Sequence, residues 1–246
     1  MMNGRDIGAV IFDKDGVLVD FERTWAPLVK ELAWEFAGHD TARAGRLLAA
    51  AGYDAANDAC IPGSVWAAGT IADLARLWRP LSAGWSEADM IERITRRGLQ
   101  LPAHPLIDMA ELRRRLERLR ARGVKLGVIS NDSPQSVRKA IVSFRLADLF
   151  DFAAGVDDVP HPKPAADPVH AFAAATGAPP DRTVVIGDNV QDGEMARAAG
   201  CALFIGVLSG TSGHDQLARL ADHVAADALA ALDWLGIPVD GRRPAL

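Results

Sequence analysis

The sequence predicts an α/β fold in which a doubly wound parallel sheet carries an all-helical domain inserted after its first strand. In residues 101–246, short apolar runs that are typical of strands buried on both faces alternate with helical patterns. Residues 21–100 break this alternation and show helical patterns only. The chain has 246 residues and 49% hydrophobic content, which suffices for one large domain, or for a core domain with a smaller companion.

Five apolar runs are expected as strands. They cover residues 7–12, 124–129, 150–154, 183–186 and 202–207. Strands that are separated by helices of ordinary length imply parallel βαβ units, so these runs should form one parallel sheet.

Four helices are expected between these strands. One begins at Asp108, where a capping box starts, and ends near Arg122 before a glycine. Proline at the first helical position indicates two more, which open at residues 133–134 and 167–168. The fourth covers residues 190–199.

Residues 21–100 are expected to form the helical domain, which leaves residues 1–20 and 101–246 for the α/β core domain. Its helices are predicted over residues 21–36, 47–51, 65–78 and 88–98. Five of the six tryptophans lie in this insert and are expected to form its core. A helical insert at this point in the chain would sit over the strand ends, where open α/β sheets bind ligands. The tail after Trp234 is expected to be a loose end.

Composition excludes some classes of function. The net charge of −5 gives no reason to expect a nucleic acid or an anionic membrane as partner. The two cysteines, Cys60 and Cys201, lie far apart, which favours a reducing compartment without disulfides or a zinc site. With no leader pattern and no run of about 20 apolar residues, the expected location is the cytoplasm. Monomer and homodimer both stay open.

The first strand is followed by two aspartates and a glycine, in the segment VIFDKDG. In an extended chain Asp13 and Asp15 would point the same way, into the ligand-binding crevice. Two such carboxylates need a cation or a shared proton, and Mg²⁺ prefers oxygen ligands of this kind. Gly16 lets the backbone turn sharply. Lys14 is expected to point away from both carboxylates into solvent. Taken alone, the segment could equally be an Asp-rich turn.

Later strand ends also carry groups that suit phosphate or a metal. Ser130 and Asn131 offer a hydroxyl and N–H groups at a strand-to-helix junction, although the segment also suits a helix cap. Lys163 lies in a proline-stiffened loop and is a point-charge partner for phosphate, although alone it would be a solvated lysine. Asp188 ends a strand, and Asp192 follows one helical turn later, where it could also serve the helix dipole, hold the lysine or contact a metal-bound water.

Together these strand ends resemble the motifs of the haloacid dehalogenase superfamily of phosphotransferases. The resemblance follows the chain in order through Asp13-x-Asp15-Gly16, Ser130-Asn131, Lys163 and Gly187-Asp188-x-x-x-Asp192. The insert is similar to the helical C1-type cap of the phosphoglycolate phosphatase and β-phosphoglucomutase branch. Residues 196–200 and 206–210 look most like the phosphoglycolate phosphatase group. The resemblance implies a Rossmann-like core and a phosphoric monoester hydrolase.

By this resemblance Asp13 is the nucleophile that forms an aspartyl-phosphate. Asp15 is the general acid and base, which protonates the leaving alcohol and then deprotonates the attacking water. The metal ligands would be the Asp13 carboxylate, the Asp15 backbone carbonyl and Asp188, with Mg²⁺ as cofactor.

The resemblance also assigns residues that bind the phosphoryl group. Ser130, the Asn131 backbone and Lys163 would bind its oxygens and stabilise the charge that develops on them. The supporting positions are Gly16, Gly187 and Asp192.

Two departures from the family pattern limit what can be carried over. Residues 104–107 replace the proline-glycine pair that many relatives carry, which affects the return hinge of the insert. Within the insert no residue matches a substrate-binding position. Four polar residues there could face the crevice, although solvated or capping roles are the stronger expectation: Arg23, Thr24, Ser64 and Thr70.

The leading hypothesis is a magnesium-dependent phosphatase for a small phosphomonoester such as 2-phosphoglycolate. A phosphomutase of the β-phosphoglucomutase type would use the same motifs but return the phosphoryl group to the sugar. A non-catalytic phosphate-binding protein is the alternative from another class, and the intact set of motif residues disfavours it.

Overall fold

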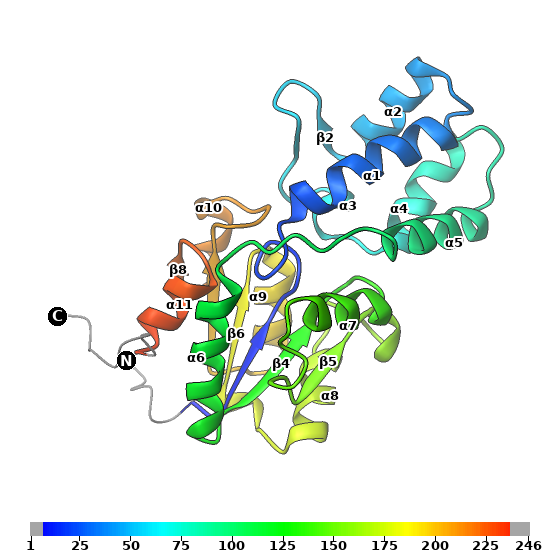
Figure 1. Ribbon diagram of the computed structural model, residues 1–246. Coiled ribbons are helices and arrows are strands. Elements are labelled where there is room, and N and C mark those ends of the chain that lie inside the picture. Colours follow the sequence, from blue (N-terminus) through cyan, green and yellow to red (C-terminus); the bar gives the residue numbers. More distant parts are fainter. Residues whose placement is uncertain (1–6, 237–246) are drawn as a thin grey trace. The chain divides into compact units, whose positions relative to one another are not determined.

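The computed structural model describes residues 7–236, which form two compact units (Figure 1). The α/β unit comprises the described residues up to Val19 and from Pro105 onward. The insert comprises Asp20–His104. Most of the tail after Trp234, from residue 237 on, lies outside the described residues.

The α/β unit is built on a six-stranded sheet in the order β5-β4-β1-β6-β7-β8, in which every neighbouring pair is parallel. Its strands are β1 (Ala9–Phe12), β4 (Lys125–Ile129), β5 (Phe152–Ala154), β6 (Thr183–Gly187), β7 (Leu203–Val207) and β8 (His223–Ala225). The doubly wound fold is confirmed, and each of the five expected strands is present. The edge strand β8 was not predicted.

Helices cover both faces of this sheet. On one face lie α6 (Met109–Ala121), α7 (Pro134–Ser143) and α11 (Ala228–Trp234). On the other face lie α8 (Asp167–Thr176), α9 (Val190–Ala198) and α10 (His214–Leu217). The period-two alternation of β1 shows why, because Val10 and Phe12 enter the first core while Ala9 and Ile11 enter the second.

The helix starts follow the sequence signals closely. The Asp108 side chain accepts hydrogen bonds from the N–H groups of Ala110 and Glu111 at the start of α6. Ser133 caps α7, whose first residue is a proline. In α8 the helix begins one residue earlier than expected, so Pro168 is its second residue. Two short 3₁₀ helices, η2 (Val156–Asp158) and η3 (Pro180–Arg182), complete the unit.

The insert is mainly helical. Its helices are α1 (Phe21–Phe36), α2 (Thr41–Ala51), α3 (Val65–Ala68), α4 (Ile71–Trp78) and α5 (Glu87–Gly98), with a 3₁₀ turn η1 (Arg79–Leu81). The expectation of an all-helical insert misses one detail, a short antiparallel pair of β2 (Tyr53–Asp54) and β3 (Ala59–Cys60).

The helix expected over residues 65–78 is two helices. It breaks at Gly69 and Thr70, because Thr70 and Asp73 form a capping box that starts α4.

Aromatic side chains dominate the core of the insert. Trp78 is fully buried, packs edge-on against Phe36 and donates from Nε1 to the Leu47 carbonyl at 2.7 Å. Trp66 is also buried, and two further tryptophans are partly buried against the same core. The expectation that all five tryptophans form the core is wrong for Trp34, which is 42% exposed.

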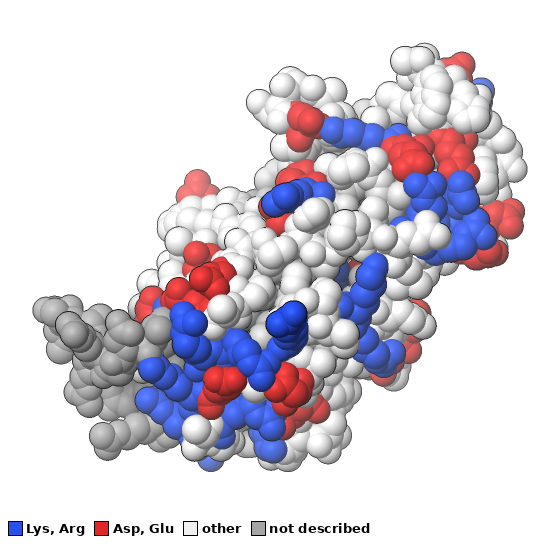
Figure 2. Space-filling view, viewed as in Figure 1, with Lys and Arg blue, Asp and Glu red and all other residues white. Residues whose placement is uncertain are grey.

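Acidic and basic side chains lie next to one another on the face shown in Figure 2. The ion pairs of the protein include Arg113 with Asp148 in the α/β unit and Arg93 with Glu35 in the insert. Among the described residues, no helix has the length and apolar character needed to cross a membrane.

Candidate active site

Asp13 directly follows β1, at the carboxyl edge of the sheet. Its backbone N–H donates to the Ile186 carbonyl at 2.9 Å, which holds it beside the end of β6. The strand β1 has β4 on one side and β6 on the other, so the strand order reverses here. Open α/β sheets bind ligands at such a reversal point.

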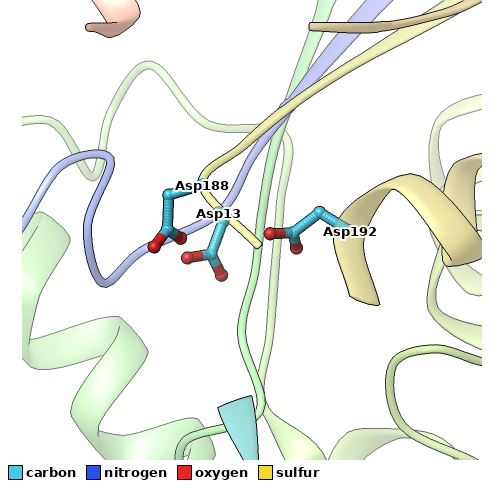
Figure 3. Close-up of side chains that lie close together, drawn as sticks. All are labelled: Asp13, Asp188 and Asp192. Carbon is cyan, nitrogen blue, oxygen red and sulfur yellow. The ribbon is translucent and has the colours of Figure 1, made fainter. Parts of the chain in front are cut away.

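Three buried carboxylates meet at this point. Asp13 follows β1, Asp188 follows β6 and Asp192 lies in the first turn of α9. One oxygen of each lies within 4.8 Å of the others, and the side chains point toward one another in Figure 3. Like charges this close in a buried place repel strongly, so the arrangement calls for positive charge.

Lys163 supplies one positive charge. Its Nζ lies 2.5 Å from Asp13 Oδ1 and 2.7 Å from Asp192 Oδ1. The other Asp192 oxygen accepts from the Asn189 backbone N–H at 3.1 Å. The expectation that Lys163 would join the motif residues, with Asp192 holding it, therefore agrees with the contacts.

Two glycines make room for the carboxylates. Gly16 has a φ of +76°, and a Cβ there would lie 2.5 Å from Asp188 Oδ2. A Cβ on Gly187 would lie 2.4 Å from the Cβ of Asp192. Any larger residue at either position would displace an acidic side chain.

The loop after β7 also contacts Asp188, and the sequence analysis missed this contact. The Asp188 Oδ2 atom accepts from the Thr211 backbone N–H at 2.7 Å and from its hydroxyl at 3.1 Å. A Cβ on Gly210 would lie 2.0 Å from the same oxygen. Ser209 and Gly210 after β7 are visible in the sequence, but no sequence pattern links them to Asp188.

Lys14 corrects another expectation. Its side chain is only 3% exposed, and Nζ lies 2.6 Å from Asp15 Oδ2 and 2.9 Å from Asp132 Oδ2. The prediction of a solvated lysine pointing away from Asp15 is wrong, because β1 ends at Phe12 and Lys14 lies in a bend. The rule for extended chains does not apply beyond that point. Asp15 is also absent from the three-carboxylate cluster.

The loop after β4 contributes Ser130 and Asn131. The Ser130 hydroxyl accepts from the Asp132 backbone N–H at 3.1 Å and, as a hydroxyl, can still donate its own proton. The Asn131 side chain donates to the Lys163 carbonyl at 3.1 Å and to Gln191 Oε1 at 3.0 Å. Asn131 thus ties the lysine loop to the start of α9.

Most of the polar candidates in the insert have structural partners there. Thr24 is buried and accepts from the His104 backbone N–H at 3.3 Å. Ser64 caps α3 and Thr70 caps α4. Arg23 is exposed. The capping roles that the sequence analysis weighed as alternatives thus describe Ser64 and Thr70.

Burial shifts the acidity of the site. It raises the pKa of Asp13 to about 6, against the lowering effect of Lys163. Burial, with the charge of Asp13, raises the pKa of Asp188 well above its usual range, and burial also raises that of Asp15. Burial alone would lower the pKa of Lys163, but the carboxylates of Asp13 and Asp192 raise it above its usual value.

The charge balance of the cluster fits a divalent cation. Three carboxylates face a single lysine, so two negative charges are left uncompensated when all are ionised. Both Asp192 oxygens already have hydrogen-bond donors, which leaves Asp13 and Asp188 as the better-placed ligands. Hard carboxylate oxygens of this kind suit Mg²⁺.

Comparison with protein families agrees with these motifs. The family model described as haloacid dehalogenase-like hydrolase matches residues 7–200, most of the chain. The chain belongs to this family. The haloacid dehalogenase resemblance predicted from the four motifs is therefore confirmed, and the match spans both the α/β unit and the insert.

Curated relatives of this haloacid dehalogenase-like chain carry the name phosphoglycolate phosphatase. The protein from Rhodospirillum rubrum is 32% identical over 124 residues, 50% of this chain and 51% of that protein. The protein from Escherichia coli strain K12 is 34% identical over 83 residues, 34% of this chain and 33% of that protein. The chain thus matches at most about half the length of these relatives.

Solved structures of other proteins share the fold. A predicted phosphoglycolate phosphatase from Haemophilus somnus 129pt superposes with a TM-score of 0.66 at 20% identity, covering 90% of this chain and 95% of that one. CbbY from Rhodobacter sphaeroides, solved in complex with phosphate, gives a TM-score of 0.62 at 20% identity, with 90% and 94% covered. At this level of identity the likeness shows the fold.

Proposed function

We propose that this protein is a magnesium-dependent phosphatase that hydrolyses a small phosphomonoester through an aspartyl-phosphate on Asp13, with 2-phosphoglycolate as the first substrate to test. The observation that carries the proposal is the buried Asp13, which shares Lys163 with Asp192 and faces Asp188. The name of the curated relatives supports the choice of first substrate.

In the first step, an Asp13 carboxylate oxygen attacks phosphorus and the bond from phosphorus to the leaving oxygen breaks. Asp15 gives its proton to that leaving oxygen. Lys163 lies against Asp13 and neutralises charge that develops on the phosphoryl oxygens. The Ser130 hydroxyl and the Asn131 backbone bind the same oxygens.

In the second step, water attacks the phosphorus of the aspartyl-phosphate. Asp15, now a carboxylate, takes the proton from that water, and inorganic phosphate leaves with Asp13 restored. Mg²⁺, held by Asp13, Asp188 and the Asp15 backbone carbonyl, would supply charge neutralisation at the phosphoryl group.

A phosphate-release assay tests this proposal. The panel contains 2-phosphoglycolate, hexose phosphates, nucleotides and amino-acid phosphates, each with Mg²⁺ and with EDTA. We expect Mg²⁺-dependent release from at least one small ester, and none from Asp13→Asn, because an amide does not replace the nucleophile. Conversion of a hexose 1-phosphate to the 6-phosphate with little release would instead establish a phosphomutase. Unchanged release by Asp13→Asn would refute the assigned nucleophile.

A further inference from the structure

The proposed mechanism leaves a second buried lysine unused. Lys14 lies between Asp13 and Asp15 in the sequence and is as deeply buried as Lys163. An ammonium group is rarely buried without partners, and Lys14 has two, Asp15 at 2.6 Å and Asp132 at 2.9 Å. Among the described residues of the α/β unit, Lys14 and Lys163 therefore each bridge two carboxylates, and of these two ammonium groups only that of Lys163 pairs with the carboxylate of the proposed nucleophile.

Asp132, the far end of this chain of charges, is itself firmly held. Its Oδ1 accepts from the Ser133 backbone N–H at 2.6 Å, so Lys14 contacts the remaining oxygen, Oδ2. Its backbone N–H donates to the Ser130 hydroxyl, and its carbonyl accepts from the Val156 N–H at 2.9 Å. Asp132 thus belongs to the same short loop as the phosphate-binding candidates.

Asp15, at the other end of this chain of charges, needs a neighbour that fixes its side chain. It follows the end of β1 and precedes Gly16, where φ is positive, so it lies in a turn and not in the sheet ladder. Its side chain is 18% exposed, against 3% for Lys14. A short carboxylate on a turn can rotate unless a neighbour fixes it, and a proton donor must lie within hydrogen-bond reach of its target.

We propose that Lys14 and Asp132 are positioning residues, which hold the Asp15 carboxylate in place through the ion-pair chain Asp132–Lys14–Asp15. The inference rests on the proposed phosphatase function and deepens it. It gives the two buried lysines separate tasks, because Lys163 serves the nucleophile and the phosphoryl group while Lys14 serves the proton carrier. It also couples the acid to the loop that carries Ser130.

Leaving-group dependence tests this inference. A 4-nitrophenyl ester leaves readily without a proton, whereas an alkyl phosphate needs one from Asp15. For Lys14→Met we expect kcat/KM for the alkyl ester to fall by ~100-fold or more, within the range of general acid catalysis. The value for 4-nitrophenyl phosphate should fall far less. Inhibition by inorganic phosphate should stay unchanged, because Ser130 and Lys163 are intact.

Three further variants complete the test. Asp132→Asn keeps the shape of the loop but removes one ion pair, so it should give the same selective loss at smaller size, even if Lys14→Met does not fold. Asp15→Asn is the reference for complete loss of the acid. Lys139→Met, at an exposed lysine on α7, is the matched control and should affect neither ester.

The outcomes separate this inference from the proposed function. Equal losses for both esters, or no loss for either, in a wild type that is active with the alkyl ester, would overturn the positioning role alone. No phosphate release by the wild type from any ester would overturn both.

Discussion

The α/β unit and the insert bury different kinds of side chain. Several charged groups are buried in the α/β unit, among them Asp13, Lys14, Lys163, Asp188 and Asp192. In the insert, all of whose residues are described, the single buried polar residue is Thr24, and the core is apolar and aromatic. Burying charge costs free energy unless it is paired, so the α/β unit retains an arrangement that folding alone does not favour. The chemistry should therefore reside there, and the insert should depend on packing.

The largest expected effect comes from removing the lysine that pairs with the acidic cluster. Lys163→Met leaves Asp13, Asp188 and Asp192 without their lysine, so phosphatase activity should fall by roughly 10²–10³-fold or more. The free energy of unfolding should fall by about 3–5 kcal/mol, the cost of breaking a buried ion pair from one side. Phosphate release and urea unfolding measure the two effects.

The control for that variant lies in the insert. Lys30 pairs with Asp58 at the surface, so Lys30→Met should cost about 1 kcal/mol at most and leave activity unchanged. If both lysine variants lost the same stability, the contrast between the units would fail.

Packing in the insert gives the next effect. Trp78→Ala should lower the free energy of unfolding by about 3–5 kcal/mol, because it leaves a cavity beside Phe36 and removes the hydrogen bond to the Leu47 carbonyl. Trp34→Ala, at an exposed tryptophan, should change it by about 0.5 kcal/mol. Fluorescence-monitored urea unfolding reports on the insert, since five of six tryptophans lie there. Equal shifts for both variants would contradict a core role for Trp78.

The acidic cluster should make stability depend on pH. Because burial raises the pKa of Asp13 to about 6, folding favours its protonated form. Without metal, this stabilisation is present below pH 4 and is lost as pH rises through about 6, up to about 3 kcal/mol. Asp13→Asn should therefore be more stable than wild type at pH 7.5 in EDTA but not at pH 4. Urea unfolding across this range measures the difference, and Mg²⁺ should reduce it.

A surface aspartate gives a control of opposite sign. Its hydrogen bond with Arg113 lowers the pKa of Asp148, so its contribution is present above its usual pKa and is lost as pH falls. Asp148→Asn should not reproduce the gain at pH 7.5. A wild type and an Asp13→Asn variant with parallel pH profiles would contradict the charge excess at the cluster.

The smallest expected effect concerns a helix cap in the insert. Thr70→Ala removes the capping box of α4 and should cost about 1 kcal/mol of stability, with KM unchanged. Thermal unfolding and steady-state kinetics measure the two. A raised KM without loss of stability would instead make Thr70 a substrate contact.

Sequence reasoning worked where one local pattern decides the structure. Continuous apolar runs indicated β1, β4 and β6, because a strand covered on both faces has no polar side. The edge strand β8 has only three residues, one of them a histidine, so it shows no such run. Helix caps such as Asp108 and Ser133 were equally local.

The meeting of Asp13, Asp188 and Asp192 was predictable, but the surroundings of Asp15 and the residues that support the acids were not. Asp13, Lys163 and Asp192 do meet, as the order of the motifs suggested. The direction of Lys14 depends on where β1 ends, within a single residue. The hydrogen bond from Thr211 to Asp188 depends on a turn after β7, and no local sequence pattern connects two positions so far apart.

The strand that directly precedes Asp13, the proposed nucleophile, is the first of the described strands but lies inside the sheet. Its partners are residues 125–128 of β4 and 183–186 of β6. During synthesis, therefore, β1 leaves the ribosome long before either neighbour exists, while the helices of the insert can already pack on each other. We expect Asp13 to stay outside any formed site until the ribosome has passed Gly187, so a stalled shorter chain would carry the motif without the site.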